Sequence, residues 1–233
     1  MTRRRWIADE ISGDHAALIG AHAQHLVRTL RAQVGQEFDI ATGNDVRRGN
    51  IVSIADDRIE FVLGEKLDIT PSPNITLVLS IFKFDRMEWA IEKCTELGVS
   101  KIVPVIAQRT EKHLASAAVK RVERWQRIAR QASEQSRRIA VPEITAPMKL
   151  PAAFELSGSR IVLAETEQQV MLKDVLPSDR DVILAFGPEG GWTEGELKVF
   201  REAGWVTASL GNTILRAETA AIAAMAVAVS LIE

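Results

Sequence analysis

Residues 181–220 read DVILAFGPEGGWTEGELKVFREAGWVTASLGNTILRAETA, and this stretch decides the fold. It begins with an apolar run of the kind that forms a strand buried on both faces. The Gly-Pro-Glu-Gly-Gly run at 187–191 ends that strand, and a T-x-x-E capping box at 193–196 starts a helix. A second apolar run, 205–210, leads to Gly-Asn and an Ala-rich helix. We therefore expect two strands that each deliver a glycine loop to a helix start, at the carboxyl edge of a parallel sheet, where ligands bind.

The bulk composition narrows the class of protein. The chain has 233 residues, a formal charge of −2 and one cysteine, Cys94. This charge gives no overall attraction to nucleic acid, so RNA binding would have to come from local basic patches. A single cysteine excludes an internal disulfide and a thiolate metal cage, and it is typical of a reducing compartment. No apolar run reaches the length of a membrane span. We expect a cytoplasmic protein with no metal site and no membrane contact.

The chain consists of two regions that differ in their pattern of predicted strands and helices. Residues 1–70 contain short β-like pieces with polar turns, which indicates a compact barrel. From Ile75 onward strands alternate with helices, which favours an α/β fold with a parallel sheet covered on both faces. We predict a first domain over 1–70 and a second over 74–233. The five predicted strands of the second domain begin at Ile75, Lys101, Arg160, Asp181 and Trp205.

Two long helices are predicted between the strands of the second domain. Residues 85–97 form an amphipathic helix that Asp85 can cap and Gly98 ends. A second long helix is predicted from Ala115 to Arg138, and it has seven Lys and Arg residues between 120 and 138. A solvated helix face is the common explanation for such a run, and an RNA-backbone surface is the alternative. Basic residues at strand ends and helix starts carry more weight as substrate contacts; these are Lys83, Arg86 and Arg109.

The spacing of the glycines in the two loops is compatible with two interpretations. No Gly-Lys-Ser/Thr follows them and they lack the G-x-G-x-x-G spacing, so they match neither a P-loop nor a dinucleotide fingerprint. They are either two tight turns or a ligand site that offers backbone N–H and C=O groups without side chains in the way. Glu189 and Glu218 would give such a site negative charge, which suits a cationic ligand better than a triphosphate.

Several segments together carry a family resemblance. FGPEGGWTEGEL at 186–197 and LGNTILRAETA at 210–220 resemble the RsmE family of 16S rRNA (uracil-N3) methyltransferases of the SPOUT superfamily. Residues 22–40, 83–99 and 120–144 are similar to further family blocks in the same order. The resemblance implies an N-terminal PUA-like RNA-binding barrel and a SPOUT methyltransferase domain with a parallel sheet and a deep trefoil knot that holds S-adenosyl-L-methionine. It also implies a homodimer that acts on the 16S rRNA of the small ribosomal subunit.

The resemblance, the chemistry of the reaction and the placement of charged residues together suggest roles for individual residues. Arg216, Glu218 and Glu189 are the catalytic candidates: either glutamate as the base that takes the N3 proton, or the arginine as the group that stabilises the uracil oxyanion. The expected cofactor-binding residues are Leu163, Gly187, Gly190, Gly191, Leu210, Gly211, Ile214, Leu215 and Arg216. The expected substrate-binding residues are Lys83, Arg86, Arg109, Arg138 and Arg28.

The chain departs from the family pattern at three places. Arg137 stands where a small residue is expected, Thr110 where Ser is usual, and Gln24 where the first His of a His-His-Leu motif is usual. Two other functions remain open at this point. One is a SPOUT methyltransferase that acts on another RNA or on a ribose 2′-hydroxyl. The other is a non-catalytic RNA-binding module.

Overall fold

The computed structural model describes residues 5–69, 72–177 and 181–232, and it consists of two compact units. Met1–Pro71 together with Ser133–Val141 form the N-terminal unit, and Ser72–Ala132 together with Pro142–Glu233 form the C-terminal unit. The domain boundaries predicted from the sequence place the short segment 133–141 in the second domain, but it packs with the N-terminal unit. Because such packing depends on contacts between residues far apart in the chain, no local pattern reveals it.

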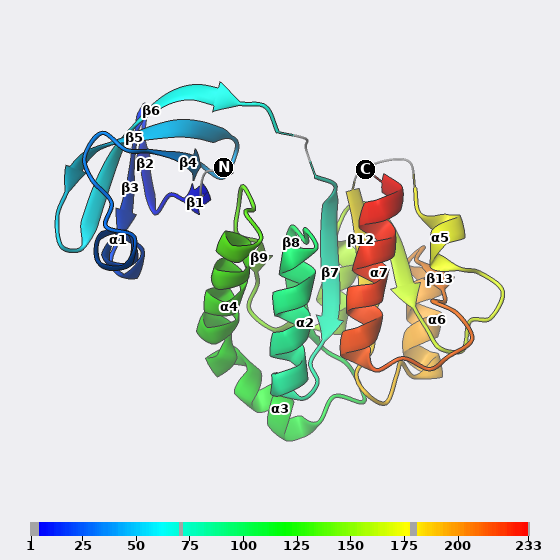
Figure 1. Cartoon of the computed structure of the whole chain (residues 1–233). Coiled ribbons are helices and arrows are strands. Elements are labelled where there is room, and N and C mark those ends of the chain that lie inside the picture. Colours follow the sequence, from blue (N-terminus) through cyan, green and yellow to red (C-terminus); the bar gives the residue numbers. More distant parts are fainter. Residues whose placement is uncertain (1–4, 70–71, 178–180, 233) are drawn as a thin grey trace. The chain divides into compact units, whose positions relative to one another are not determined.

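Six strands of the N-terminal unit form one curled sheet in the order β1-β4-β5-β6-β3-β2 (Figure 1). All neighbours are antiparallel except the pair β1 and β4. A hairpin that turns at Asp56-Asp57 joins β5 to β6. The bounds are β1 Arg5–Ile7, β2 Glu10–Ser12, β3 His15–Ile19, β4 Glu37–Ala41, β5 Val46–Ile54 and β6 Arg58–Leu67.

One short helical segment lies between β3 and β4. It begins as α1, Ala21–Gln24, and continues as a wider π-helical turn over His25–Thr29. Leu26 of this turn is fully buried, and it packs with Leu18 and Phe61 of the sheet in the core of the N-terminal unit. The helix therefore covers one side of the curled sheet.

Polar contacts attach the segment 133–141 to this sheet and helix. His22 of α1 places Nε2 2.9 Å from Glu134 Oε1 and Nδ1 3.3 Å from Asp9 Oδ2. Arg5 Nη1 donates a hydrogen bond to the Arg137 carbonyl at 2.7 Å. Arg137 has φ +58°, a region that favours glycine, at the position where the resemblance implies a small residue.

The His22 contacts predict a pH-dependent attachment of that segment. The hydrogen bond with Glu134 raises the pKa of His22, Asp9 adds to the effect and burial opposes it. A raised pKa gives stabilisation that is present below the unfolded-state value near 6.5 and is lost as pH rises through the folded-state value. Hydrogen-exchange protection of residues 133–141, corrected for intrinsic exchange rates, should therefore fall as the pH rises. In His22→Gln this fall should disappear, and an identical fall in both proteins would contradict the assignment.

A parallel sheet forms the centre of the C-terminal unit. Its strands lie in the order β10-β8-β7-β12-β11-β13, and β9 pairs with β8 (Figure 1). The five predicted strands are all present and parallel, and the two short edge strands β9 and β10 were not predicted. The bounds are β7 Asn74–Ser80, β8 Lys101–Ile106, β9 Glu143–Ile144, β10 Met148–Lys149, β11 Ser159–Leu163, β12 Asp181–Phe186 and β13 Val206–Ala208.

The helices correct the sequence reading in two places. The long helix predicted from Ala115 to Arg138 is three consecutive pieces, α3, a 3-10 turn and α4. Asp85 is not the cap of α2, because the chain is already helical at Phe84; it lies in the first turn, where its charge favours the helix dipole. The bounds are α2 Phe84–Glu96, α3 Lys112–Ala117, the 3-10 turn Ala118–Arg121, α4 Val122–Gln135, the 3-10 turn Leu150–Glu155, α5 Leu172–Val175, α6 Glu194–Glu202 and α7 Ala217–Ile232.

At the end of α2 and the start of α6, the structure agrees with the sequence signals. Gly98, with φ +106°, ends α2 as predicted. The predicted capping box opens α6: the Thr193 hydroxyl accepts a hydrogen bond from the Glu196 backbone N–H, and the Glu196 carboxylate accepts one from the Thr193 backbone N–H. Because this box fixes where α6 starts, it also fixes the glycine loop that precedes it.

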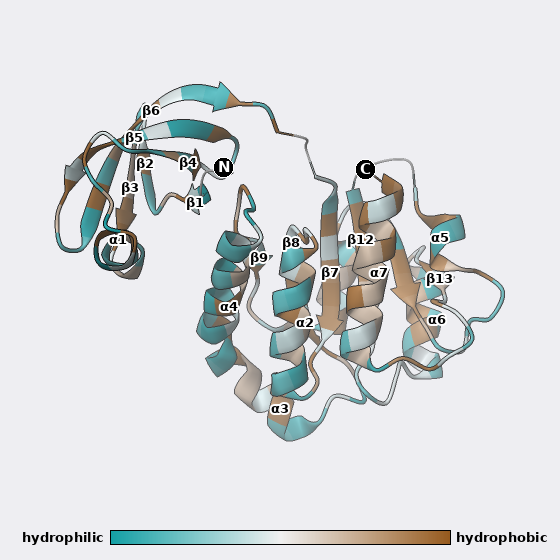
Figure 2. Cartoon of the chain, in the orientation of Figure 1, coloured by the Kyte–Doolittle hydropathy of each residue, from teal (hydrophilic) through white to brown (hydrophobic). Residues whose placement is uncertain are grey.

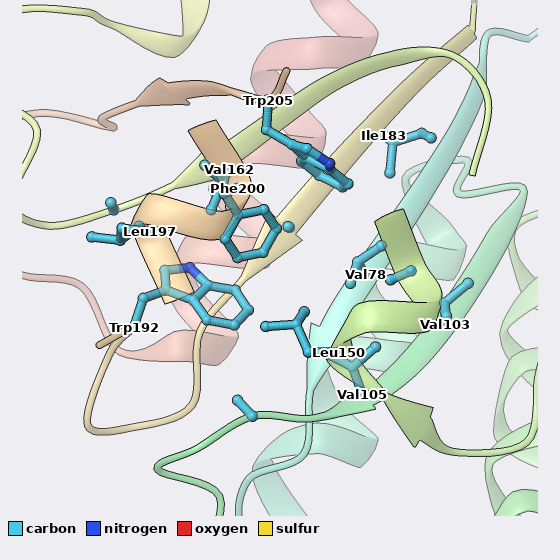
Figure 3. Close-up of a cluster of buried hydrophobic side chains, with 14 residues drawn as sticks. Val78, Val103, Val105, Leu150, Val162, Ile183, Trp192, Leu197, Phe200 and Trp205 are labelled. Carbon is cyan, nitrogen blue, oxygen red and sulfur yellow. The ribbon is translucent and has the colours of Figure 1, made fainter. Parts of the chain in front are cut away.

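One apolar cluster holds α6 against the sheet (Figure 3). Phe200 of α6 lies at its centre, with ring centroids 4.9 Å from Trp192 and 5.0 Å from Trp205 in edge-on geometry. Trp192 also donates a hydrogen bond from Nε1 to the Leu163 carbonyl at 3.1 Å. The cluster therefore ties the end of β11 to the loop that follows β12, and it positions both for the site described next.

Candidate functional site

A pocket of about 320 Å³ opens at the carboxyl ends of β11, β12 and β13. Its walls come from three loops: residues 163–166 after β11, residues 186–192 without Gly190 after β12, and residues 208–217 between β13 and α7. The volume lies at the lower end of the range that small-molecule sites occupy. The pocket is at the sheet edge at which the two glycine loops were expected.

Glycine is required at two points of the second loop. Gly191 has φ +68°, and a Cβ built on it would lie 3.1 Å from Oε1 of Glu165. A Cβ on Gly187 would lie 3.2 Å from the carbonyl carbon of Gly191 and from the nitrogen of Trp192. These approaches are tighter than nine in ten real Cβ contacts. Side chains at these two positions would press on the neighbouring backbone or on Glu165, so glycine here leaves room for the loop to close.

Most of the residues predicted to bind a cofactor line this pocket. The exception is Gly190, whose carbonyl accepts a hydrogen bond from Arg109. Sequence reasoning did not single out Ser209, which lines the pocket and shapes the third loop by accepting a hydrogen bond from the Gly211 N–H at 3.2 Å. A Ser two residues before a Gly is a signal for such a turn. The predicted residues that line the pocket are Leu163, Gly187, Gly191, Leu210, Gly211, Ile214, Leu215 and Arg216.

The charged residues at the pocket form one connected group around Arg86. This arginine lines the pocket and donates from Nη1 to Glu189 Oε1 at 2.8 Å, while its Nε lies 3.7 Å from Glu218 Oε1. Glu189 also lines the pocket, whereas Glu218 is buried and does not. Glu218 Oε2 has no hydrogen-bond partner among the described residues. Arg216 is exposed on the pocket wall, and no described acidic side chain forms an ion pair with it.

Arg109, predicted to bind substrate, is engaged with the second loop. Its Nη1 donates to the carbonyls of Gly190 and Trp192. The neighbouring Gln108 donates its backbone N–H to Glu196 Oε1 at 2.7 Å. Because Glu196 belongs to the α6 capping box, the loop after β8 and the loop after β12 hold each other in place.

The other three predicted substrate residues, Lys83, Arg28 and Arg138, are not among the residues that line this pocket. Lys83 is exposed at the N-cap of α2. Arg28 and Arg138 belong to the N-terminal unit, and burial lowers the pKa of Arg138 to about 10. Among the described residues, none of the helices has both the length and the apolar character that a bilayer crossing requires.

The sequence matches a family model described as an RNA methyltransferase domain, over residues 70–229. A ribosomal RNA small subunit methyltransferase E from Synechocystis is 33% identical over 93% of this chain and 73% of its own length. The protein of the same name from Aquifex aeolicus is 32% identical over 94% of this chain and 96% of its own length. Both the domain model and these relatives therefore extend over most of the chain.

Two solved structures resemble the fold over nearly its whole length. A ribosomal RNA small subunit methyltransferase E from Neisseria gonorrhoeae bound to S-adenosyl methionine has a TM-score of 0.83 and 30% identity, and covers 97% of this chain and 96% of its own. A putative methyltransferase from Legionella pneumophila in complex with the bound cofactor SAM has a TM-score of 0.81 and 27% identity, with 97% of both chains covered. The chain belongs to the RNA methyltransferase family that includes ribosomal RNA small subunit methyltransferase E.

Proposed function

We propose that this protein transfers the methyl group of S-adenosyl-L-methionine to N3 of a uridine in the 16S rRNA of the small ribosomal subunit. The observation that carries the proposal is the pocket on two glycine loops at the carboxyl edge of the sheet, in a chain of the RNA methyltransferase family. The relatives named above are small subunit rRNA methyltransferases, and two similar structures hold S-adenosylmethionine.

The pocket residues fit this methyl donor. When bound, the donor supplies a methyl group on a positively charged sulfonium, which is already electrophilic. Gly187 and Gly191 leave the backbone of the second loop free of side chains, so its N–H and C=O groups can hydrogen-bond a polar ligand. Glu165 and Glu189 line the same pocket and attract a cation.

The geometry separates the two candidate bases. Uracil N3 is a poor nucleophile until its proton is removed, so a positioned carboxylate near it would speed transfer. The Glu189 side chain is 29% exposed on the pocket wall, and its ion pair with Arg86 fixes its place. Glu218 is 3% exposed behind the lining residues. We assign proton removal to Glu189 and treat Glu218 as a residue that positions Arg86.

Two cations complete the proposed active site. Arg86 and Arg216 both line the pocket, where a fixed positive charge can stabilise the negative charge that develops on the uracil oxygens. Because N3 lies on the base-pairing edge, the target uridine must be unpaired when it reaches them. Orientation of the base by these groups lowers the barrier further, by up to several kcal/mol.

We also propose a fold family for each of the two domains. We assign residues 1–70 to a PUA-like RNA-binding barrel and 74–233 to a SPOUT domain with a trefoil knot. The knot rests on the family resemblance, and the parallel sheet of the C-terminal unit agrees with the SPOUT assignment. Since the proposed substrate is ribosomal RNA, we also place the protein in the cytoplasm.

A homodimer is the assembly that we propose. Helices α2 and α7 lie side by side, and Figure 2 shows α7 mainly in the white and brown shades of less polar residues. Trp89 of α2 is 49% exposed and Leu231 of α7 is 56% exposed. An apolar surface of this kind gains stability when a second copy covers it.

Mass spectrometry of rRNA nucleosides tests the proposed function. In 16S rRNA from a strain that lacks the gene, 3-methyluridine should be absent, and purified protein with S-adenosylmethionine should restore it on isolated small subunits. Loss of a ribose-methylated nucleoside, or of a nucleoside from another RNA, would redirect the proposal to a different target. An unchanged nucleoside profile together with no calorimetric heat on addition of the methyl donor would favour a non-catalytic RNA-binding module.

A further inference from the structure

We propose that the exposed surface made by Lys120, Arg121, Arg124 and Arg127, here called the basic face, binds the phosphate backbone of the RNA that enters the pocket. This inference rests on the proposed function, because it names how the same enzyme holds its RNA. The basic face belongs to the 3-10 turn Ala118–Arg121 and the first two turns of α4.

The basic face carries more positive charge than its acidic neighbours balance. Arg124 forms two hydrogen bonds, of 2.6 and 2.7 Å, with the Glu88 carboxylate of α2. Arg121 Nη1 lies 3.9 Å from the same carboxylate, so two guanidinium groups share one negative charge. Lys120 and Arg127 are exposed, and neither forms an ion pair with any described residue. The surplus is local, because the whole chain has a formal charge of −2.

Aromatic packing holds part of the basic face in place. The Arg121 guanidinium carbon lies 4.7 Å from the centroid of the Phe84 ring. Phe84 in turn packs edge-on against Trp125, which is fully buried, with ring centroids 6.1 Å apart. A guanidinium stacked in this way keeps its N–H groups free for a planar, bidentate partner such as phosphate. Because its orientation is already restricted, it loses less side-chain entropy on binding.

The same contacts connect the basic face to the pocket. Phe84 is the first residue of α2, Lys83 is its N-cap, and Arg86 in the same turn lines the pocket. Basic side chains are therefore found from the pocket wall, across the start of α2, to α4. In Figure 1 α4 lies beside α2, and Figure 2 shows that α4 is mainly hydrophilic. An RNA strand with its target base in the pocket can follow this path with its phosphates.

Charge complementarity selects RNA as the occupant. Phosphate contacts supply most of the sequence-independent affinity for nucleic acid, and each one releases counterions and steepens the salt dependence. A merely solvated helix face makes no such contribution. The number of phosphate contacts can therefore be measured from the dependence of RNA affinity on salt.

The test compares two double variants of the full-length protein. Lys120→Gln/Arg127→Gln removes the two unpaired charges of the basic face, and Lys198→Gln/Arg201→Gln is the matched control on α6, where both side chains are also exposed. Binding of a labelled 16S rRNA transcript is measured between 50 and 200 mM salt, the range over which phosphate contacts change affinity most clearly. Methyl transfer to small subunits and calorimetric binding of S-adenosylmethionine are measured in parallel.

For the basic-face variant we expect a salt slope shallower by about 1.4, which corresponds to roughly two phosphates on a single strand. The affinity at 0.1 M salt should fall by about tenfold or more. KM for the rRNA should rise while kcat and the affinity for the methyl donor stay unchanged, and the control variant should match the wild type.

A salt slope equal to that of the wild type, or an equal loss in both double variants, would overturn the inference. The charge-reversed variant Lys120→Glu/Arg127→Glu is a second test. If phosphates contact this face, it should weaken RNA binding more than Lys120→Gln/Arg127→Gln does. Failure of the proposed function is distinguishable: it would appear as absent methyl transfer by the wild type, whereas the RNA-binding slopes do not depend on catalysis.

Discussion

Glu189→Gln should lower the single-turnover rate constant of methyl transfer by a factor of about 10² to 10⁴, the range that a positioned base supplies. The Glu189 carboxylate lines the pocket and Arg86 holds it at 2.8 Å. Glutamine has nearly the same shape and can still accept the hydrogen bond from Arg86, but it does not take a proton. The affinity for S-adenosylmethionine should therefore change little while the chemical step slows. The measurement is rapid-quench transfer of labelled methyl with enzyme in excess.

Two further substitutions identify the cause of that loss. Glu194→Gln, on the exposed first turn of α6, should leave the rate unchanged. Glu218→Gln should slow transfer less than Glu189→Gln, because Glu218 reaches the pocket only through Arg86. The deficit of Glu189→Gln should also shrink as the pH rises, since hydroxide can then remove the N3 proton. A full rate in Glu189→Gln would mean that Glu189 is not the base. A larger loss in Glu218→Gln than in Glu189→Gln would mean that the two glutamates exchange roles.

Gly191→Val should weaken S-adenosylmethionine binding by about 100-fold, which corresponds to roughly 3 kcal/mol. The native φ of +68° is unfavourable for a β-branched residue, at a cost of about 1–3 kcal/mol. A Cβ would also lie 3.1 Å from Glu165 Oε1, so the Glu165 carboxylate on the loop after β11 would have to shift by a few tenths of an ångström. Both loops line the pocket. Calorimetric titration with the methyl donor measures the change.

Gly195→Ala serves as the control for that substitution. Gly195 lies on α6, and a Cβ there would meet only the Thr193 hydroxyl at 3.9 Å, which is an ordinary contact. This variant should bind the methyl donor like the wild type. Circular dichroism should show that Gly191→Val is still folded. A folded Gly191→Val that binds the donor with native affinity would mean that the second loop does not form the donor site.

Local signals in the sequence were sufficient for five strands of the parallel sheet and for the sheet edge at which the pocket opens. Each buried strand of the C-terminal unit is a short apolar run that ends at a polar or glycine-rich turn, and such runs are readable without knowledge of their neighbours. The capping box at Thr193 fixed the start of α6 in the same way. Since parallel strands present their carboxyl ends at one edge, the meeting of the two glycine loops followed from these assignments.

Contacts between distant residues could not be predicted in this way. Arg109 and Gly190 are 81 positions apart, and Arg86 and Glu189 are 103 apart, so no spacing rule indicated that these pairs would meet. The predicted helix over 115–138 changes to a 3-10 turn at Ala118 although its composition continues to favour a helix. Tertiary packing decided all of these features.

The most direct measurement is a crystal structure of the protein soaked with S-adenosylmethionine. Our account predicts density for the methyl donor in the pocket between residues 187–191 and 209–216, with its sulfonium methyl open to the side lined by Arg86 and Glu189. Density for the donor at another place on the protein, or side chains that fill this pocket while the donor remains unbound at saturating concentration, would contradict it.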